Sequence, residues 1–415
     1  MCLIYNLGIL LYGWVLRLAA PFNHRAALLL QGRRRVWGDL AAFSGGDKVA
    51  WVHCASLGEF EQGRPLIEAL RKQRPDHKVV LTFFSPSGYE VRKNYELADL
   101  VLYLPADTAA NARRFIDKVQ PSEVYFIKYE YWFHYFKALK RRNIPLYLVS
   151  AIFREEQIFF KWYGGWFRKL LPLVTRFFVQ DERSASLLRS IGVAHCEVAG
   201  DTRFDRVKAL VEQAREVPVI ADFAKGQRVL VAGSTWPPDE AILAKWQEQA
   251  PEDVKIIVAP HEVHEAHVQE LVARFKGGVA RFSQLKGAVP AEVRVLVIDT
   301  IGLLSSLYRY GSVAYIGGGF GKGIHNTLEA ATYGMPVIFG PHHKKFKEAM
   351  DLLEEGAAFA IAGQADFEQV MAGLWDGDAA RLAAAGAAAS AYVGRMTGAT
   401  ERVLGVSADA QATQD

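Results

Sequence analysis

Cysteine is scarce in this sequence, with only Cys2, Cys54 and Cys196 among 415 residues. Three such widely separated thiols are too few for a disulfide framework or for a zinc site built from cysteines, and they fit a reducing compartment. Two nucleotide-binding signatures are missing as well. No G-x-G-x-x-G segment follows the first predicted strand of either half of the chain, and no Walker lysine motif occurs. The standard dinucleotide and triphosphate motifs are therefore excluded.

Acidic residues are almost absent from the first tenth of the chain. Residues 1–40 contain five arginines and a single acid, Asp39, whereas residues 41–415 contain 44 charges of each sign. The whole net charge of +4 therefore lies near the N-terminus, and this distribution argues against a nucleic-acid partner. An apolar share of 51% and a charged share of 23% are typical of a folded protein, here with about two or three domains.

An apolar run occupies residues 3–20, although Asn6, Arg17 and two glycines interrupt it. It reaches only the lower limit of a membrane-spanning helix, about 17–25 residues. No basic region precedes it, which argues against a signal peptide. We expect residues 1–40 to form a membrane-associating segment at the cytoplasmic face of a membrane, with anionic lipids bound by its arginines, namely Arg17, Arg25, Arg33, Arg34 and Arg35. A true span, or a helix buried in its own domain, remains an alternative.

Short β-branched runs alternate with helical stretches from Val49 onward, which is typical of parallel sheets covered by helices. The predicted strands fall into two series: 49–53, 78–83, 101–104, 123–127, 145–149, 176–180 and 196–199, then 228–232, 255–259, 293–298, 312–316, 336–339 and 358–361. The sequence thus predicts an α/β protein with two Rossmann-like doubly wound domains, 41–206 and 226–392, with a linker at 207–225 and a tail at 393–415. Ligands bind outside the carboxyl ends of such strands, so two facing domains would form a central cleft.

Two carboxylates follow predicted strands of the first half. Glu59 lies in Ser56-Leu57-Gly58-Glu59 after strand 49–53, and Glu130 lies among aromatic residues after strand 123–127. Glu59 either caps the helix that Ser56 begins or acts as a general base. Glu130 is either a surface residue under an aromatic lid or a group that orients a substrate. The spacing leaves both alternatives open.

The second half contains a glycine cluster, residues 317–323, after strand 312–316. Glycines allow close approach of the backbone to a ligand, and the helix expected to open at about Asn326 would favour a phosphate. Asn326 and Glu329 have the spacing of a capping box, but Glu329 could instead bind ribose hydroxyls. The turn Gly233-Ser234-Thr235 either caps a helix or donates hydrogen bonds to a phosphate.

Three histidines, His261, His264 and His267, recur at three-residue intervals. Neighbouring pairs would share a helix face, but no group of carboxylates accompanies them. We therefore expect a solvated helix start or a single nucleotide-facing histidine, and no metal site.

Taken together, the motifs resemble in order those of the 3-deoxy-D-manno-octulosonic acid (Kdo) transferases of lipopolysaccharide biosynthesis, over about residues 5–390. The resemblance rests on the ordered set: Ser56-Leu57-Gly58-Glu59, Tyr103 to Asp107, Glu130 with Trp132, Phe204-Asp205, Gly233-Ser234-Thr235, Asp299 to Gly302, and the run from Gly317 through Glu329 to Phe346. It implies a GT-B glycosyltransferase that moves Kdo from CMP-Kdo to a lipid A precursor with inversion, using neither a metal nor a cofactor.

The resemblance also implies roles for individual residues. Glu59 matches the general base, with Ser56 and Gly58 beside the acceptor, and Glu130 matches a second essential carboxylate. Arg203 stands where the family usually has lysine and would face the donor's carboxylate or phosphate. The implied CMP site comprises Ser234, Thr235, His261, Ile301, Gly302, Gly319, Asn326 and Glu329.

Two segments depart from the family pattern. The segment Lys128 to His134 differs from the usual Glu-Thr-Glu-Leu-Trp-Pro-Asn, and Ala259-Pro260-His261-Glu262 lacks the usual arginine, which His261 would replace. The aromatic and basic stretch 153–169 either joins the N-terminal helix at the membrane or forms a core helix. The alternative functions are a GT-B transferase that uses a UDP-sugar and a non-catalytic, membrane-associated binding protein.

Overall fold

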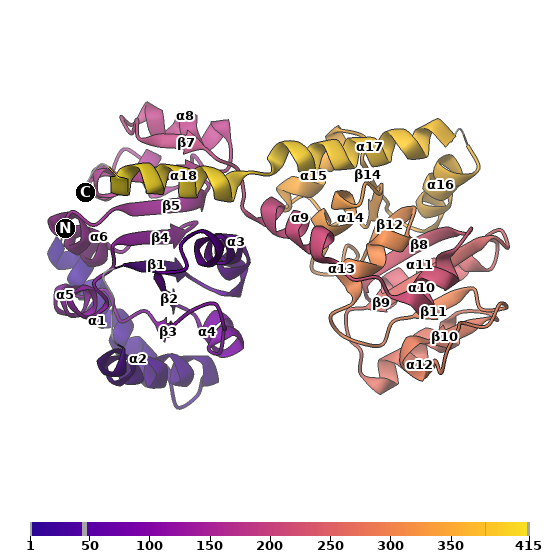
Figure 1. Cartoon of the computed structure of the whole chain (residues 1–415), viewed down its shortest axis with the longest axis horizontal. Helices are drawn as coiled ribbons and strands as arrows, with labels where there is room; N and C mark the ends of the chain where they lie inside the picture. Colours follow the sequence, from indigo (N-terminus) through magenta and orange to yellow (C-terminus); the bar gives the residue numbers. More distant parts are fainter. Residues whose placement is uncertain (1, 44–47, 378, 413–415) are drawn as a thin grey trace. The chain divides into compact units, whose positions relative to one another are not determined.

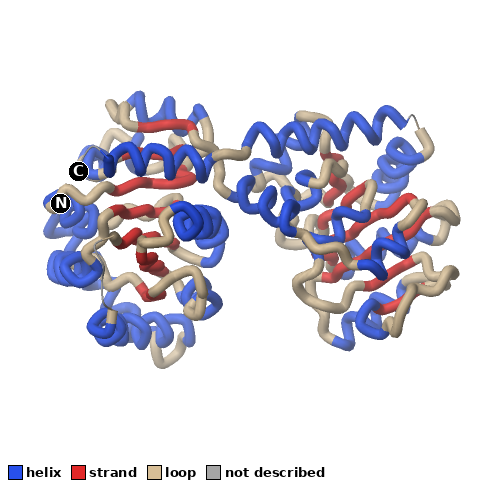
Figure 2. Tube along the Cα trace, in the orientation of Figure 1, coloured by secondary structure: helices blue, strands red, loops and turns tan. Residues whose placement is uncertain are grey.

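The computed structural model describes residues 2–43, 48–377 and 379–412. It divides the chain into two compact units. The first comprises Met1–Arg206 with Thr397–Asp415, and the second comprises Val207–Met396. Figure 2 shows the same construction in each unit, with strands inside and helices on both sides.

The first unit contains a seven-stranded parallel sheet in the order β3-β2-β1-β4-β5-β6-β7. Its strands are β1 (Val49–Cys54), β2 (Lys78–Phe83), β3 (Leu100–Tyr103), β4 (Glu123–Ile127), β5 (Leu146–Ala151), β6 (Arg176–Val179) and β7 (Cys196–Val198). The order reverses between the neighbours β1 and β4, which makes the carboxyl ends of these two strands the topological switch point of the sheet.

Helices cover both faces of this sheet: α1 (Cys2–Ala19), α2 (His24–Ala42), α3 (Leu57–Gln73), α4 (Pro86–Arg92), α5 (Ala109–Val119), α6 (Phe133–Arg141), α7 (Gly165–Arg168), α8 (Glu182–Ser190) and α18 (Ala399–Ala412). Helix α9 (Arg203–Gln213) begins in this unit and continues into the second. All six residues of β1 are buried, and they alternate between two cores. Val49 and Trp51 pack on the face of α2 and α5, whereas Ala50 and Val52 pack on the face of α3. The continuous apolar strands of the sequence thus follow from burial on both faces.

The second unit repeats this topology in the order β10-β11-β9-β8-β12-β13-β14, with its switch point between β8 and β12. Its strands are β8 (Arg228–Thr235), β9 (Val254–Pro260), β10 (Val279–Arg281), β11 (Val295–Val297), β12 (Val313–Ile316), β13 (Val337–Phe339) and β14 (Ala358–Ala360). Its helices are α10 (Pro218–Ala224), α11 (Pro237–Gln247), α12 (Glu265–Arg274), α13 (Leu304–Leu307), α14 (Leu328–Thr332), α15 (Lys347–Glu354), α16 (Gln364–Trp375) and α17 (Ala379–Met396).

The segments expected as a linker and a tail are largely helical. Residues 207–225 continue α9 and form α10, where Ile220 and Phe223 are buried. The chain then returns at its end to the first unit, where α18 packs on α3 and buries Val403 and Leu404 (Figure 1). Asp205 fixes this return because its carboxylate accepts hydrogen bonds from the backbone of Gly398 and Thr400.

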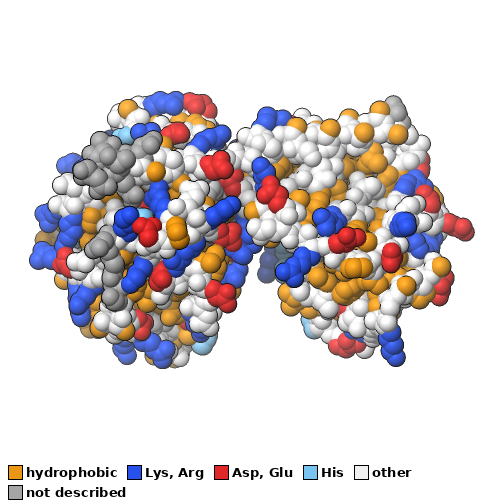
Figure 3. Space-filling view, viewed as in Figure 1, with side chains coloured by type: hydrophobic (Ala, Val, Ile, Leu, Met, Phe, Trp, Pro, Cys, Tyr) orange, Lys and Arg blue, Asp and Glu red, His pale blue; other side chains and the backbone are white. Residues whose placement is uncertain are grey.

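Charged side chains show no large single-sign field on the face drawn in Figure 3. There, Lys and Arg are interspersed with Asp and Glu on both units, as the balanced charge of residues 41–415 led us to expect.

Candidate active site

The two carboxylates singled out in the sequence lie at the same edge of the first sheet. Glu59 follows β1 and Glu130 follows β4, and these strands are hydrogen-bonded neighbours with His53 opposite Phe126. Because parallel strands end at the same edge, the fold brings both motifs to the switch point of this sheet.

Glu59 occupies the first turn of α3, whose N-cap is Ser56. The Ser56 hydroxyl accepts from the Gly58 amide at 3.3 Å and donates to Glu59 Oε2 at 2.5 Å. The capping interaction is therefore present, and it holds a partly exposed carboxylate at the positive end of a 17-residue helix. A helix cap and a general base are compatible roles for this side chain.

Glu130 is held from two directions. Its Oε2 accepts a hydrogen bond from Trp132 Nε1 at 2.8 Å and lies 3.4 Å from His53 Nε2. The His53 ring is fully buried, whereas the Glu130 side chain keeps 18% of its surface exposed. The preceding Lys128 has a φ of 71°, a strained backbone conformation of the kind that collects at functional sites.

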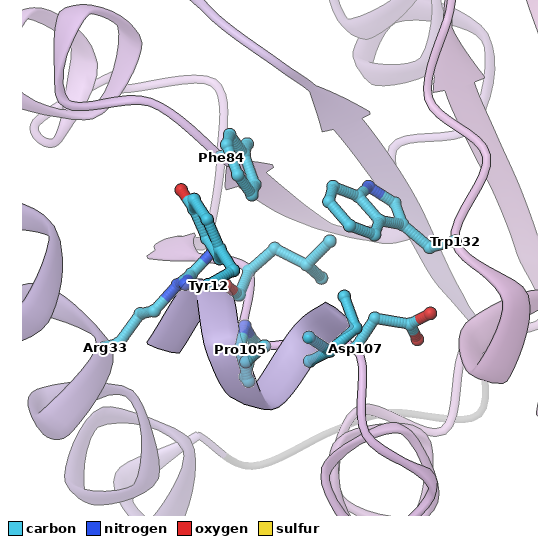
Figure 4. Close-up of a pocket in the computed structure, with 9 residues that line it drawn as sticks. Tyr12, Arg33, Phe84, Pro105, Asp107 and Trp132 are labelled. Carbon is cyan, nitrogen blue, oxygen red and sulfur yellow. Dashed lines mark hydrogen bonds between the residues drawn. The ribbon is translucent and has the colours of Figure 1, made fainter. Parts of the chain in front are cut away.

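A stack of aromatic rings connects Trp132 to the N-terminal helix. The Phe84 ring stacks on Trp132 with a centroid distance of 5.2 Å and on Tyr12 of α1 at 6.2 Å (Figure 4). The small cavity beside these rings has a volume of about 10 Å³, enough for about one water molecule. It is therefore a packing feature and not a substrate pocket.

Arg33 borders the same cavity and departs from the expectation that it meets lipid headgroups. Its guanidinium carbon lies 5.1 Å from the centre of the Phe84 ring, and its Nε donates to the carbonyl of Leu104. Burial lowers the pKa of Arg33. Arg33 thus joins α2 to the sheet, while Arg17, Arg25, Arg34 and Arg35 are exposed.

Arg203 begins α9 and is tied to α3, the helix of Glu59. Its Nε donates to Asp201 Oδ2 at 2.9 Å, and the same carboxylate accepts from Gln62 Nε2 at 2.9 and 3.0 Å. Asp201 and Gln62 are buried, whereas Arg203 keeps 36% of its side chain exposed. The network places a cation beside the helix that carries the candidate base.

In the second unit, β8 ends with Ser234 and Thr235, whose side chains differ in exposure and in hydrogen bonding. Ser234 has a φ of 53° and is partly exposed. Thr235 is fully buried, and its hydroxyl donates to Glu240 Oε1 at 3.2 Å. The Thr235 side chain therefore supports the turn from within, which leaves Ser234 as the residue of this pair that faces outward.

His261 lies in a three-ring stack that the sequence did not reveal. Its ring stacks on Trp236 at 4.7 Å and on His325 at 4.4 Å. Trp236 Nε1 can only donate, and its bond to His325 Nε2 at 3.1 Å assigns the His325 proton to Nδ1. Burial, with a contribution from His261, lowers the pKa of His325. The loops after β8, β9 and β12 thus present an aromatic surface.

The glycine cluster after β12 lies directly against the end of β8. A Cβ on Gly317 would lie 2.2 Å from the Ser234 carbonyl oxygen, and one on Gly319 would lie 2.6 Å from the backbone of Gly340. The Gly318 amide donates to Asp239 Oδ2 at 2.9 Å. Because Gly317 and Gly319 have no side chains, the ends of β8, β12 and β13 can lie in contact. The Gly318 amide already donates a hydrogen bond within the protein.

We expect Gly317→Ala to destabilise the second unit by about 1–3 kcal/mol because the backbone must move to admit the methyl group. The free energy of unfolding, measured in denaturant, checks this. Gly321→Ala is the matched control, since its Cβ would lie 3.6 Å from the nearest atom. Equal stability of the two variants would contradict the proposed packing role of Gly317.

The other residues expected to contact CMP lie in the loop after β11 and around the start of α14. Ile301 is exposed and Gly302 has a φ of 94°, both in the loop after β11. Helix α14 begins at Leu328, two residues later than expected, and is five residues long. Asn326 therefore precedes the cap, accepts from the Leu328 amide and donates to Glu329 Oε1 at 2.9 Å.

The three histidines at 261, 264 and 267 have separate roles. His264 caps α12, and His267 is buried and lies 2.9 Å from Glu240 Oε1. Burial raises the pKa of Glu240. Among the described residues, no group of three histidine, cysteine or acidic side chains is arranged to hold a metal ion.

Sequence reasoning missed three residues that shape these sites: His53, Thr82 and Trp236. His53 and Thr82 lie inside apolar strands, where a polar residue facing the core is itself a signal. Trp236 directly follows the Ser-Thr turn, but nothing in its local pattern indicates a stack with histidines from two other loops.

Comparison with known proteins finds similarity to Kdo transferases. Residues 30–206 match the family described as 3-deoxy-D-manno-octulosonic-acid transferase (kdotransferase). The chain is 29% identical over 373 residues to a 3-deoxy-D-manno-octulosonic acid transferase of Bordetella pertussis, covering 85% of both chains. It is 27% identical over 324 residues to one from Aquifex aeolicus, covering 76% of this chain and 83% of that protein.

Solved structures show the fold. A putative UDP-N-acetylglucosamine 2-epimerase of Listeria monocytogenes matches 89% of this chain with a TM-score of 0.59 and 16% identity. MurG of Acinetobacter baumannii matches 86% with a TM-score of 0.54 and 14% identity. Both likenesses support two doubly wound domains of the GT-B type. With the sequence matches, they describe a glycosyltransferase with the GT-B fold that is similar to Kdo transferases over most of its length.

Proposed function

We propose that this protein transfers Kdo from CMP-Kdo to a hydroxyl of a lipid A precursor, with inversion, at the cytoplasmic face of the inner membrane. One observation carries the proposal. Residues 30–206 match the Kdo transferase family, and within them Glu59 and Glu130 lie at the ends of adjacent parallel strands, at the switch point of the sheet.

In the proposed reaction Glu59 takes the proton of the acceptor hydroxyl while the hydroxyl oxygen attacks the anomeric carbon of Kdo. The bond from that carbon to the phosphate oxygen breaks, and CMP leaves with the electron pair. Because CMP is a good leaving group, the protein mainly aligns the reactants and removes the proton. Arg203, held by Asp201, would face the donor's carboxylate or phosphate.

The second unit would bind the CMP group at its own switch point. Ser234 and the outer ends of β9 and β12 lie there, with His261 stacked between two rings. The remaining contacts would come from loops at the carboxyl ends of strands, namely Ile301, Gly302, Gly319, Asn326 and Glu329. The Thr235 hydroxyl would act from inside the turn.

Helix α1 would bring the enzyme to its lipid acceptor. It is 18 residues long and apolar enough to cross a membrane, and none of its residues is buried. Its polar side chains instead attach it to the first unit: the Tyr5 hydroxyl donates to Asp107, and Asn6 Oδ1 lies 2.6 Å from His134 Nε2. A helix fixed at its side to a folded unit is better suited to lie on a membrane than to cross it.

The sequence left two explanations open for the aromatic stretch 153–169, a membrane contact and a core helix. Different residues of the stretch fit each of them. Phe153 and Phe159 belong to the core, whereas Trp162 is 91% exposed and Tyr163 is 56% exposed. The Trp166 ring lies 5.7 Å from that of Tyr5 and so links this stretch to α1. We propose that Trp162 and Tyr163 enter the membrane interface beside α1.

The direct test is mass spectrometry of the lipid product after the protein is incubated with a lipid A precursor and either CMP-Kdo or UDP-sugars. The expected product is the precursor with Kdo attached, formed from CMP-Kdo alone. The same spectrum reports how many Kdo residues are added. Transfer from UDP-sugars only would overturn the proposal, and no transfer by the folded protein would favour a binding role.

A further inference from the structure

His53 is a fully buried, polar residue that the proposed reaction does not use. It is the fifth residue of β1, and its imidazole lies between two polar side chains. Its Nδ1 is 2.8 Å from Thr82 Oγ1 on β2, and its Nε2 is 3.4 Å from Glu130 Oε2 after β4. The ring therefore bridges the interior of the sheet and the candidate second carboxylate.

The surrounding hydrogen bonds assign the tautomer of this ring. Trp51 Nε1 can only donate, and it donates to Thr82 Oγ1 at 2.8 Å. Thr82 therefore donates its single hydroxyl proton to His53 Nδ1. His53 therefore carries its proton on Nε2, directed at Glu130. In the opposite tautomer the Nε2 lone pair would face the carboxylate, and the buried Thr82 proton would lose its acceptor.

We propose that His53 is a positioning residue that holds Glu130 in its working orientation by donating from Nε2. The inference rests on the proposed function and assigns this role to a residue outside the substrate-contacting set. Trp132 and His53 donate to the same oxygen, Oε2, from the loop and from the sheet respectively. The carboxylate plane is thereby fixed, and Oε1 is the oxygen that meets a substrate. The 3.4 Å separation is long for a hydrogen bond, as is common before substrate tightens a site.

Steady-state kinetics of two variants tests the role of the Nε2 donor. The amide of His53→Gln reaches the Nε2 position, whereas the shorter His53→Asn reaches only the Nδ1 position. We expect His53→Asn to lower kcat by about 10- to 100-fold with little change in KM, as for a misplaced catalytic group, and His53→Gln to recover most of that loss. Equal kcat in all three proteins, or no recovery with Gln, would overturn the proposal.

A double variant separates positioning from a general effect on the fold. If His53 acts through Glu130, adding His53→Asn to Glu130→Gln should cause no further loss of kcat. Losses that multiply would show that His53 acts independently of Glu130. Binding of CMP and the thermal unfolding midpoint, measured on each variant, show whether the protein remains folded.

The tautomer can be measured without turnover. With ¹⁵N-labelled histidine in the full-length wild-type protein, the imidazole signals that disappear in His53→Gln identify His53. They should show a neutral ring protonated at Nε2. Protonation at Nδ1 would overturn the inference whatever the substrate proves to be. Failure of wild-type protein to transfer Kdo, with the Nε2–H signal present, would instead count against the proposed function.

Discussion

Glu59→Gln is expected to lower kcat for Kdo transfer by about 100- to 10,000-fold, the usual contribution of a general base. Glutamine has nearly the same shape and can still accept the hydrogen bond from Ser56, so α3 keeps its N-terminal interaction. It cannot take the proton of the acceptor hydroxyl. The loss should therefore appear in kcat, measured by product formation at saturating CMP-Kdo and lipid A precursor.

Glu61→Gln is the matched control for this experiment. Glu61 lies on the same helix two residues later, is 39% exposed and pairs with Arg92 at 3.1 Å. Surface ion pairs contribute about 0–1 kcal/mol, so this variant should retain activity and stability. If Glu59→Gln transferred Kdo as fast as Glu61→Gln, the general-base role would be wrong.

Replacing both Leu7 and Leu11 by glutamate is expected to weaken binding to anionic vesicles on the order of 100-fold or more. Both leucines are 62% exposed and lie one turn apart on α1. Inserting a leucine side chain into an apolar phase is worth about 1.5–3 kcal/mol, and the introduced carboxylates add repulsion from anionic headgroups. Co-sedimentation with vesicles of phosphatidylglycerol and phosphatidylethanolamine measures the change.

Val91→Glu provides the control, because Val91 is a similarly exposed apolar residue, 58% accessible, on α4. It should bind vesicles like the wild-type protein. The Leu7/Leu11 variant should also bind CMP normally, since the nucleotide contacts are proposed in the other unit. Unchanged vesicle binding by that variant would contradict a membrane role for α1.

The strands could be predicted because burial on both faces produces continuous apolar runs. Every strand of the first unit was expected within about two residues of its position, since short β-branched runs such as 78–83 favour a buried strand over a helix by their length. In the second unit β10 was missed. It has three residues, ends in Arg281 and pairs only with β11 in the described sheet, so it lacks an apolar run.

The longer-range features could not be predicted in the same way. The return of α18 to the first unit depends on Asp205, about half the chain length away in sequence, and on α3, which lies near the other end of the chain. The orientation of Thr235 into the interior depends on Glu240 and His267, and both belong to other elements. Local patterns located Glu59 and Glu130, but only the sheet order shows that they share an edge.

The aromatic stack from Tyr12 through Phe84 to Trp132 bears on how this protein should be shortened for study. Removing residues 2–19 to improve solubility would take away the ring beside Phe84 as well as the partners of Asp107 and His134. Trp132, the donor to Glu130, would lose part of its support. An inactive truncated enzyme would then reveal nothing about lipid surfaces, which is why exposed-face substitutions are the sounder tool.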